Sequence, residues 1–322
     1  MESATGRWVS GNDFFDRESE LQVLDARVRA GNHTLLTGQR RMGKTSIVRE
    51  LGRRLEDMGW VFLFTDVEDA TCPEDVIADI AQEVHPIRPV VSRLATKLRR
   101  FTGLNWFTEH LDEASAFTFR VKIRAMLNTG NWRRHGEQLV QDCAKHDQPV
   151  LLAIDELPIF IKRLLDKHDD GAHRVDQFLS WLRGVLQAID GPSPVLLVSG
   201  SIGLAPLVQR IGLPDRINYL DSLRLGPWDR HASISCFERL AADHRLQVEE
   251  GVAAAVYDAI GLGIPHHVQS FFARLREFSI MHERDRVTVA DVDTVYRTAL
   301  LAARGKRPLA EPVGSASLTM SN

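Results

Sequence analysis

The chain has 322 residues, of which 44% are hydrophobic and 26% are charged, so it can bury one large core or two unequal ones. Its formal net charge of -3 provides no overall attraction to nucleic acid or to an anionic membrane, and such binding would need a local patch. Residues 1–10 lack the apolar stretch of a signal peptide, and no later run reaches the roughly 18 apolar residues of a membrane span. We therefore expect a cytoplasmic protein with no membrane partner.

The cysteines exclude two further classes. Cys72, Cys143 and Cys236 lie far apart in the sequence and form no CxxC pair. This spacing disfavours a zinc site or a disulfide framework, and it predicts small buried side chains in a reducing compartment.

Hydrophobic spacing predicts alternating helices and strands in the first quarter of the chain. Leu21, Leu24 and Val28 recur at spacings of three and four residues, which is typical of one face of a helix. The expected elements are a helix at 16–29, a strand at 33–37, a helix at 44–58, a strand at 60–65 and a helix at 73–84. This order makes a βαβ unit, which implies a parallel sheet with right-handed crossovers.

The pattern is less regular between residues 85 and 136, which we interpret as a basic insert at about 85–135. It contains a basic helical stretch at 91–101 and an alternating stretch at 117–123. The alternation has a period of two and indicates a half-exposed strand or hairpin. Regularity returns with a helix at 132–145, a strand at 150–154, a helix at 175–189, a strand at 195–199 and a last strand within 217–225.

Gly226 and Pro227 mark a boundary, beyond which the pattern is helical. The expected helices are at 230–244, 249–260, 265–281 and 289–303, and the Pro-, Gly- and Ser-rich residues 304–322 are expected to be disordered. The predicted organisation is an N-terminal segment at 1–15, an α/β core with a parallel sheet at 16–226, a helical domain at 227–303 and the tail at 304–322.

A glycine-rich loop connects the strand expected at 33–37 to the helix that follows it. Residues 38–45 read GQRRMGKT and fit the Walker A pattern GxxxxGK[ST] without a mismatch. In such a loop, backbone N–H groups surround the phosphates, Lys44 neutralises the β and γ phosphates of ATP, and Thr45 gives its hydroxyl oxygen to Mg²⁺. The expected ATP-binding residues are Gly38, Gln39, Arg40, Arg41, Met42, Gly43, Lys44, Thr45 and Ser46.

Two adjacent carboxylates follow the apolar strand at 150–154. In open α/β sheets, ligands bind at the C-terminal ends of the strands. Asp155 is therefore expected to hold Mg²⁺, and Glu156 to orient or deprotonate an attacking water. A Walker A loop alone is equally compatible with a kinase that transfers the phosphoryl group to a small molecule. The adjacent acids Asp155 and Glu156 favour transfer to water.

These motifs together resemble those of the archaeal-type AAA+ ATPases, which are related to the STAND and origin-recognition branches of that superfamily. The resemblance covers residues 14 to about 301 and rests on five segments, at 15–21, 38–46, 155–158, 199–201 and 263–265. It implies a doubly wound parallel sheet followed by a helical lid, which is winged-helix-like in some members.

The resemblance also implies roles for single residues. Ser201, with Ser199 as the second candidate, matches the polar sensor of the γ-phosphate, although a helix N-cap explains Ser201 equally well. Arg216 matches an arginine finger that reaches a neighbouring subunit, with Arg210 as the alternative and a surface arginine as the simpler explanation. Pro265 lies in a segment that resembles the nucleotide-reading lid motif, and a helix start explains it as well.

The insert carries a local positive charge. Residues 88–134 include ten Lys or Arg and three acids. Arg99, Arg100, Arg133 and Arg134, interleaved with aromatic residues, are candidates for contacts with DNA, and the alternative is a solvated helix face with aromatic core anchors.

The sequence thus predicts an ATP-hydrolysing molecular switch that transmits its nucleotide state to a protein partner or through self-association. One alternative is a DNA-associated loader or transposition-type accessory ATPase, and another is a nucleotide-bound scaffold with little turnover.

Overall fold

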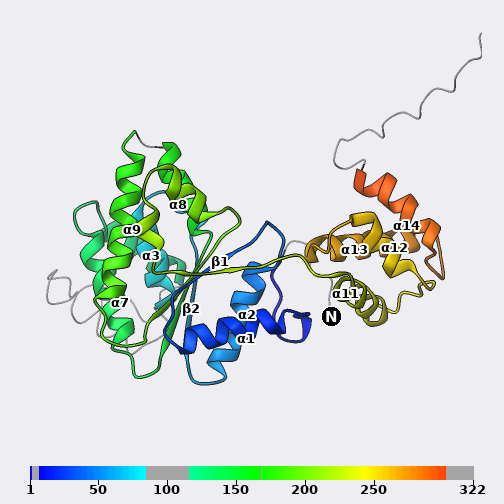
Figure 1. The fold of residues 1–322 in the computed structure, drawn as a ribbon, viewed down its shortest axis with the longest axis horizontal. Helices are drawn as coiled ribbons and strands as arrows, with labels where there is room; N and C mark the ends of the chain where they lie inside the picture. Colours follow the sequence, from blue (N-terminus) through cyan, green and yellow to red (C-terminus); the bar gives the residue numbers. More distant parts are fainter. Residues whose placement is uncertain (2–6, 85–115, 168, 302–322) are drawn as a thin grey trace, which may run out of the picture. The chain divides into compact units, whose positions relative to one another are not determined.

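The structure, a computed structural model, describes residue 1 and residues 7–84, 116–167 and 169–301 (Figure 1). The described residues fall into two units, one formed by residues 7–226 and the other by residue 1 with residues 227–301. None of the described helices combines the length and the apolar character that a membrane span requires.

The first unit is built on a five-stranded parallel sheet with the strand order β2-β3-β4-β1-β5. The strands are β1 (Thr34–Thr37), β2 (Val61–Asp66), β3 (Val150–Asp155), β4 (Val195–Ser199) and β5 (Asp221–Arg224). The chain enters the sheet at β1, passes to the edge at β2 and returns through β3 and β4. The C-terminal ends of β1, β4 and β3 are therefore neighbours, which is where ligands bind in such sheets.

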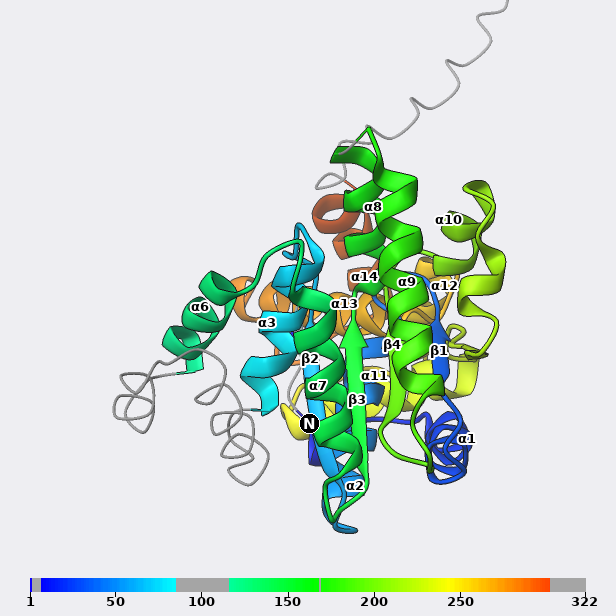
Figure 2. The ribbon, with the colours of Figure 1, turned by 90° about the vertical axis from the view of Figure 1, so that its left-hand side faces the viewer.

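Helices cover both faces of this sheet, so β3 and β4 are buried along their whole length. Figures 1 and 2 show α1 (Glu18–Arg29) and α2 (Lys44–Glu56) on one face. On the other face lie α3 (Pro73–Val84), α7 (Trp132–Ala144), α8 (Leu157–Lys167) and α9 (Gly171–Gln187). The remaining elements described in this unit are η1 (Gly11–Asp13), α6 (Ala116–Met126), α10 (Leu204–Arg210) and η2 (Pro214–Ile217).

An aromatic cluster fills the core between α7, α8 and α9. The rings of Phe160 and Phe178 meet edge to face with centroids 5.1 Å apart, and those of Trp132 and Trp181 do the same at 5.1 Å. Such pairs add to the stabilisation from burial alone. Trp132 is only 4% exposed, so this aromatic residue of the predicted basic insert is a core residue.

The prediction of a strand or hairpin at 117–123 is wrong, because these residues belong to α6, which packs on α3. Arg120 forms an ion pair with Asp79 of α3, and Arg124 forms one with Asp75 at 2.5 Å. Both the cations and the acids are four residues apart, so the pairs match two packed helices. The tertiary contacts therefore favour a helix where the local alternation indicated a strand. The helical stretch expected at 91–101 lies outside the described residues.

The second unit contains α11 (Arg230–Asp243), α12 (Val252–Ile260), α13 (Pro265–Met281), α14 (Val289–Val295) and the π-helical turn η3 (Tyr296–Leu301). Its core is formed by side chains such as Phe237, Phe271 and Phe272, which are fully buried. The helix expected at 289–303 is thus divided between α14 and η3. The α/β class with a parallel sheet and a following helical region is confirmed.

Candidate nucleotide-binding site

The loop after β1 folds around its own lysine. Gly43 adopts a left-handed conformation with φ of 85° just before α2, which glycine tolerates without a steric penalty. The ammonium group of Lys44 donates hydrogen bonds to the backbone oxygens of Gly38 and Gln39 at 3.0 and 2.9 Å. Lys44 is 6% exposed, and this burial lowers its pKa, although the carboxylates of Glu156 and Asp155 act in the opposite direction. The cation therefore lies inside the loop, close to the two acids.

Asp155 accepts hydrogen bonds from the first turn of α2, from the end of β4 and from the residue that follows β3. Its Oδ2 accepts a hydrogen bond from the hydroxyl of Thr45 at 2.6 Å, and its Oδ1 accepts one from the hydroxyl of Ser199 at 2.6 Å. The N–H of Glu156 donates to the same Oδ1 at 3.0 Å. At 2% exposure, the carboxylate depends on these donors for its polar contacts.

This arrangement fits a magnesium ion that is shared with a bound phosphate. Thr45 and Asp155 present a hydroxyl and a carboxylate oxygen side by side, and Mg²⁺ is usually held by one or two side-chain oxygens together with phosphates and water. Among the described residues, no group of three or more His, Cys, Asp or Glu is suited to hold a metal ion by itself. A metal held by Thr45 and Asp155 would take its remaining ligands from bound phosphate and from water.

Glu156 is held in place by the residues that follow β4. Its backbone is left-handed, with φ of 57°, which is uncommon for a residue with a side chain and often marks a functional site. The Oε2 of Glu156 accepts hydrogen bonds from the N–H and the hydroxyl of Ser201 at 2.8 and 2.9 Å. Gly200 is required here, because a Cβ atom would lie 2.4 Å from Cδ of Pro158. The alternative prediction that Ser201 is a helix N-cap is wrong, since Gly203 is the N-cap of α10.

The other residues proposed for the site, Arg216, Arg210 and Pro265, are not part of the loops that follow β1, β3 and β4. Arg216 lies in η2 and forms ion pairs with Asp176 of α9 at 2.6 Å and with Asp215. Hydrogen bonding to Arg216 lowers the pKa of Asp176. Arg210 is exposed at the end of α10, and Pro265 is the first residue of α13 in the second unit. The roles suggested for these three residues stay predictions.

The loop residues before and after Lys44 differ in exposure. Met42 is 2% exposed and packs into the core, whereas Arg40 and Arg41 are exposed. Arg40 comes within 3.9 Å of the carboxylate of Glu68. Ser46, which follows the lysine and threonine, accepts a hydrogen bond at its hydroxyl from a backbone N–H of the N-terminal segment.

The structure places two of the four arginines considered for DNA contacts. Arg133 and Arg134 lie on α7, with the guanidinium of Arg133 4.9 Å from the ring centre of Trp132. Arg99 and Arg100 lie outside the described residues. The two arginines of α6 that form ion pairs with α3 have their charge balanced by acids, which reduces the local positive charge of this region.

Two carboxylates that the sequence motifs do not identify, those of Asp66 and Glu50, lie on the elements that flank the site. Asp66 ends β2 directly opposite Asp155, and although its side chain is exposed, partial desolvation and the negative charges of Asp155 and Glu156 raise its pKa. The signal was present, since β2, like β3, is an apolar run that ends on an acid. Glu50 of α2 is 2% exposed. In the sequence, the only feature that indicates this burial is its position between Ile47 and Leu51, at the border of the buried face of the helix.

Comparisons with known proteins support the fold. No protein-family model and no curated protein matches the chain. Among solved structures, the Walker-type ATPase of Pyrococcus abyssi matches with a TM-score of 0.61 and 17% identity, over 94% of this chain and 76% of that one. The ORC2 protein of Aeropyrum pernix, in ADPNP and ADP complexes, matches with a TM-score of 0.58 and 13% identity, over 90% of this chain and 70% of that one.

The ORC1 protein of Aeropyrum pernix in complex with DNA matches with a TM-score of 0.52 and 17% identity, over 88% of this chain and 65% of that one. The expected structural similarity to AAA+ ATPases is therefore confirmed. At these identities the comparisons show the fold, and the activity has to be argued from the site itself.

Proposed function

We propose that the chain binds ATP together with Mg²⁺ and hydrolyses the bond between the γ-phosphorus and the β-γ bridging oxygen. The observation that supports this most strongly is the direct hydrogen bond between Thr45 and Asp155, beside the buried Lys44. It joins two motifs that are 110 residues apart in sequence, at the edge of the sheet where such folds bind ligands.

Each residue has a defined part in this reaction. Lys44 neutralises charge on the β and γ phosphates, and Thr45 and Asp155 hold the metal. When bound, Mg²⁺ supplies positive charge that stabilises the phosphate oxygens as the bond breaks. The oxygen of a water molecule attacks the γ-phosphorus, the bond to the β-γ bridging oxygen breaks, and ADP leaves with that electron pair. Glu156 accepts the proton of the attacking water. Ser201 orients the carboxylate of Glu156 by donating a hydrogen bond to its Oε2.

We further propose that hydrolysis serves a switch. The described residues form an α/β unit that carries the site and a second, helical unit. If the nucleotide has different affinities for two conformations of these units, its binding and hydrolysis shift the protein between them. The output is then transmitted to a protein partner or through self-association.

ATP turnover tests the proposal. Wild type and Glu156→Gln are compared in nucleotide affinity and in phosphate release, with Glu137→Gln, an exposed substitution on α7, as the matched control. We expect Glu156→Gln to bind ATP but to lose at least about a hundredfold in turnover, and the control to behave as wild type. Full turnover by Glu156→Gln contradicts its assignment. Binding without turnover by wild type supports the scaffold alternative instead.

A DNA-associated loader is the second candidate, because the fold resembles that of a protein solved in complex with DNA. In this case double-stranded DNA at low salt stimulates ATP turnover, and the affinity for DNA falls steeply as salt rises. Neutralising Arg99, Arg100, Arg133 and Arg134 should abolish DNA binding. The absence of any DNA binding at low salt rules this candidate out.

A further inference from the structure

Residues 8–11, here named the N-terminal strap, lie along helix α2 and contact it at three points. The guanidinium of Arg49 lies 4.3 Å from the ring centre of Trp8. The N–H of Val9 donates to the hydroxyl of Ser46 at 3.1 Å, and the N–H of Gly11 donates to Oε2 of Glu50 at 2.7 Å. Arg49 and Glu50 follow Ser46 by three and four residues, so both lie on the same side of α2 as Ser46.

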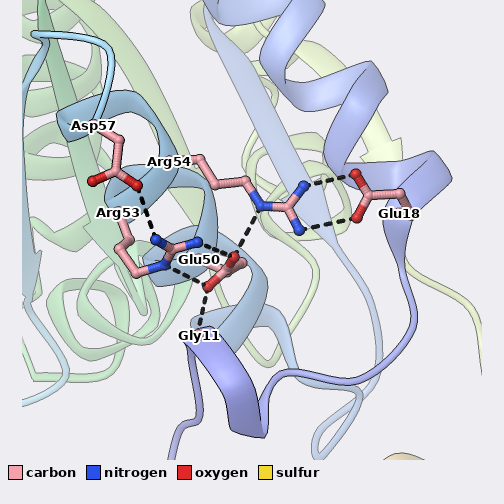
Figure 3. Close-up of polar contacts among 6 residues, drawn as sticks. All are labelled: Gly11, Glu18, Glu50, Arg53, Arg54 and Asp57. Atoms are coloured by element: carbon pink, nitrogen blue, oxygen red, sulfur yellow. Dashed lines mark hydrogen bonds and ion pairs between the residues drawn. The ribbon is translucent and has the colours of Figure 1, made fainter.

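Glu50 is the centre of this arrangement (Figure 3). Its carboxylate, 2% exposed, accepts hydrogen bonds from Arg53 at 2.9 and 3.1 Å and from Arg54 at 2.9 Å, besides the one from Gly11. Arg54 in turn donates two hydrogen bonds to Glu18, at 2.7 and 2.9 Å. One buried acid thus links the strap, α2 and the first turn of α1. A buried carboxylate with several charged donors is costly to disrupt, because its removal leaves the donors without their acceptor.

The strap and the phosphate loop share the beginning of α2. Ser46 directly follows Lys44 and Thr45, so the hydroxyl that accepts the N–H of Val9 belongs to the residue whose backbone is expected to meet a phosphate. Glu50 lies one turn further along the same helix. A strap that is docked on this face restrains the first turn of α2. By thermodynamic linkage, a nucleotide that orders this turn must also stabilise the docked strap.

We propose that Glu50 is a positioning residue that couples docking of the N-terminal strap to the binding of a nucleoside triphosphate. The coupling rests on the proposed function, since it requires that the loop at 38–45 binds nucleotide. Glu50 acts through the strap and α2 and does not touch the reacting atoms, so it should change affinity and leave the chemical step nearly unaltered.

Two measurements on the full chain test this coupling. The first is the dissociation constant for ATP with Mg²⁺, together with kcat and KM, and the second is hydrogen exchange at the Val9 and Gly11 amides with and without nucleotide. Glu50→Gln is compared with Asp57→Asn, which removes an exposed acid that also accepts a hydrogen bond from Arg53, at 2.9 Å. We expect Glu50→Gln to weaken ATP binding about tenfold, to keep kcat within about twofold and to speed exchange at both amides. Asp57→Asn should leave the ATP affinity, kcat and the exchange rates of both amides as they are in wild type.

A second variant protects the test against misfolding. Trp8→Ala removes the exposed ring that lies over the Arg49 guanidinium and leaves the sequence of α2 unchanged, so it should weaken docking of the strap and lower the affinity for ATP as Glu50→Gln does. ATP in wild type should slow exchange at both amides, as reciprocity requires. Faster exchange in Glu50→Gln with an unchanged affinity overturns the coupling and leaves the proposed function intact. Failure of wild type to bind ATP overturns both.

Discussion

The contact between Ser201 and Glu156 leads to a quantitative prediction about catalysis. In Ser201→Ala, the carboxylate loses the hydroxyl donor at 2.9 Å and keeps the backbone N–H donor at 2.8 Å. A hydrogen bond to a charged group contributes about 1.5–3 kcal/mol. Because one donor stays and Glu156 is only half-buried, we expect the lower end of this range. A loss of about 1.5 kcal/mol corresponds to a kcat that is lower by slightly more than about tenfold, with little change in KM.

Steady-state phosphate release, with nucleotide affinity measured separately, provides the assay. Ser180→Ala is the matched control, because it removes a serine hydroxyl that donates to the carboxylate of Asp176 at 3.1 Å at an exposed position of α9. A double-mutant cycle gives the stricter test, since Ser201→Ala should cost almost nothing further in the background of Glu156→Gln. Equal losses in both backgrounds would refute the reasoning, because Ser201 would then act independently of Glu156.

Three further predictions concern binding and stability. Lys44→Ala should weaken ATP binding by about 2 to 5 kcal/mol in a titration, because it removes the buried cation from the loop. Gly200→Ala should destabilise the protein by about 1–3 kcal/mol in urea, since its Cβ would lie 2.4 Å from Pro158, whereas Gly184→Ala, with open space in α9, should stabilise it by about 1 kcal/mol. Burial opposes ionisation of Glu50, yet hydrogen bonds from two arginines and a backbone N–H lower its pKa to about 2. The stability from its charge is therefore complete above about pH 4.5 and is lost as the pH falls toward about 2, and Glu50→Gln should flatten this loss in acid denaturation.

Some parts of this fold could be predicted from local sequence. β3 and β4 are uninterrupted apolar runs, and a parallel strand that is covered on both faces requires such a run. α3 begins and ends where its spacing and Pro73 indicate. α8 and α10 were not predicted, and α6 was predicted wrongly, because short segments with mixed spacing fit a helix and a strand equally well.

The sequence by itself determined the phosphate loop and the two acids after β3, because each is a contiguous motif whose chemistry depends on neighbouring residues. Only the tertiary structure decided which side chains meet there. Ser199 reaches Asp155 across 44 residues, and Thr45 reaches it across 110. The contact between Glu50 and the N-terminal strap likewise joins residues 39 apart, which no local pattern encodes. Such contacts depend on strand order and helix packing, which arise from burial over the whole core and not from any single segment.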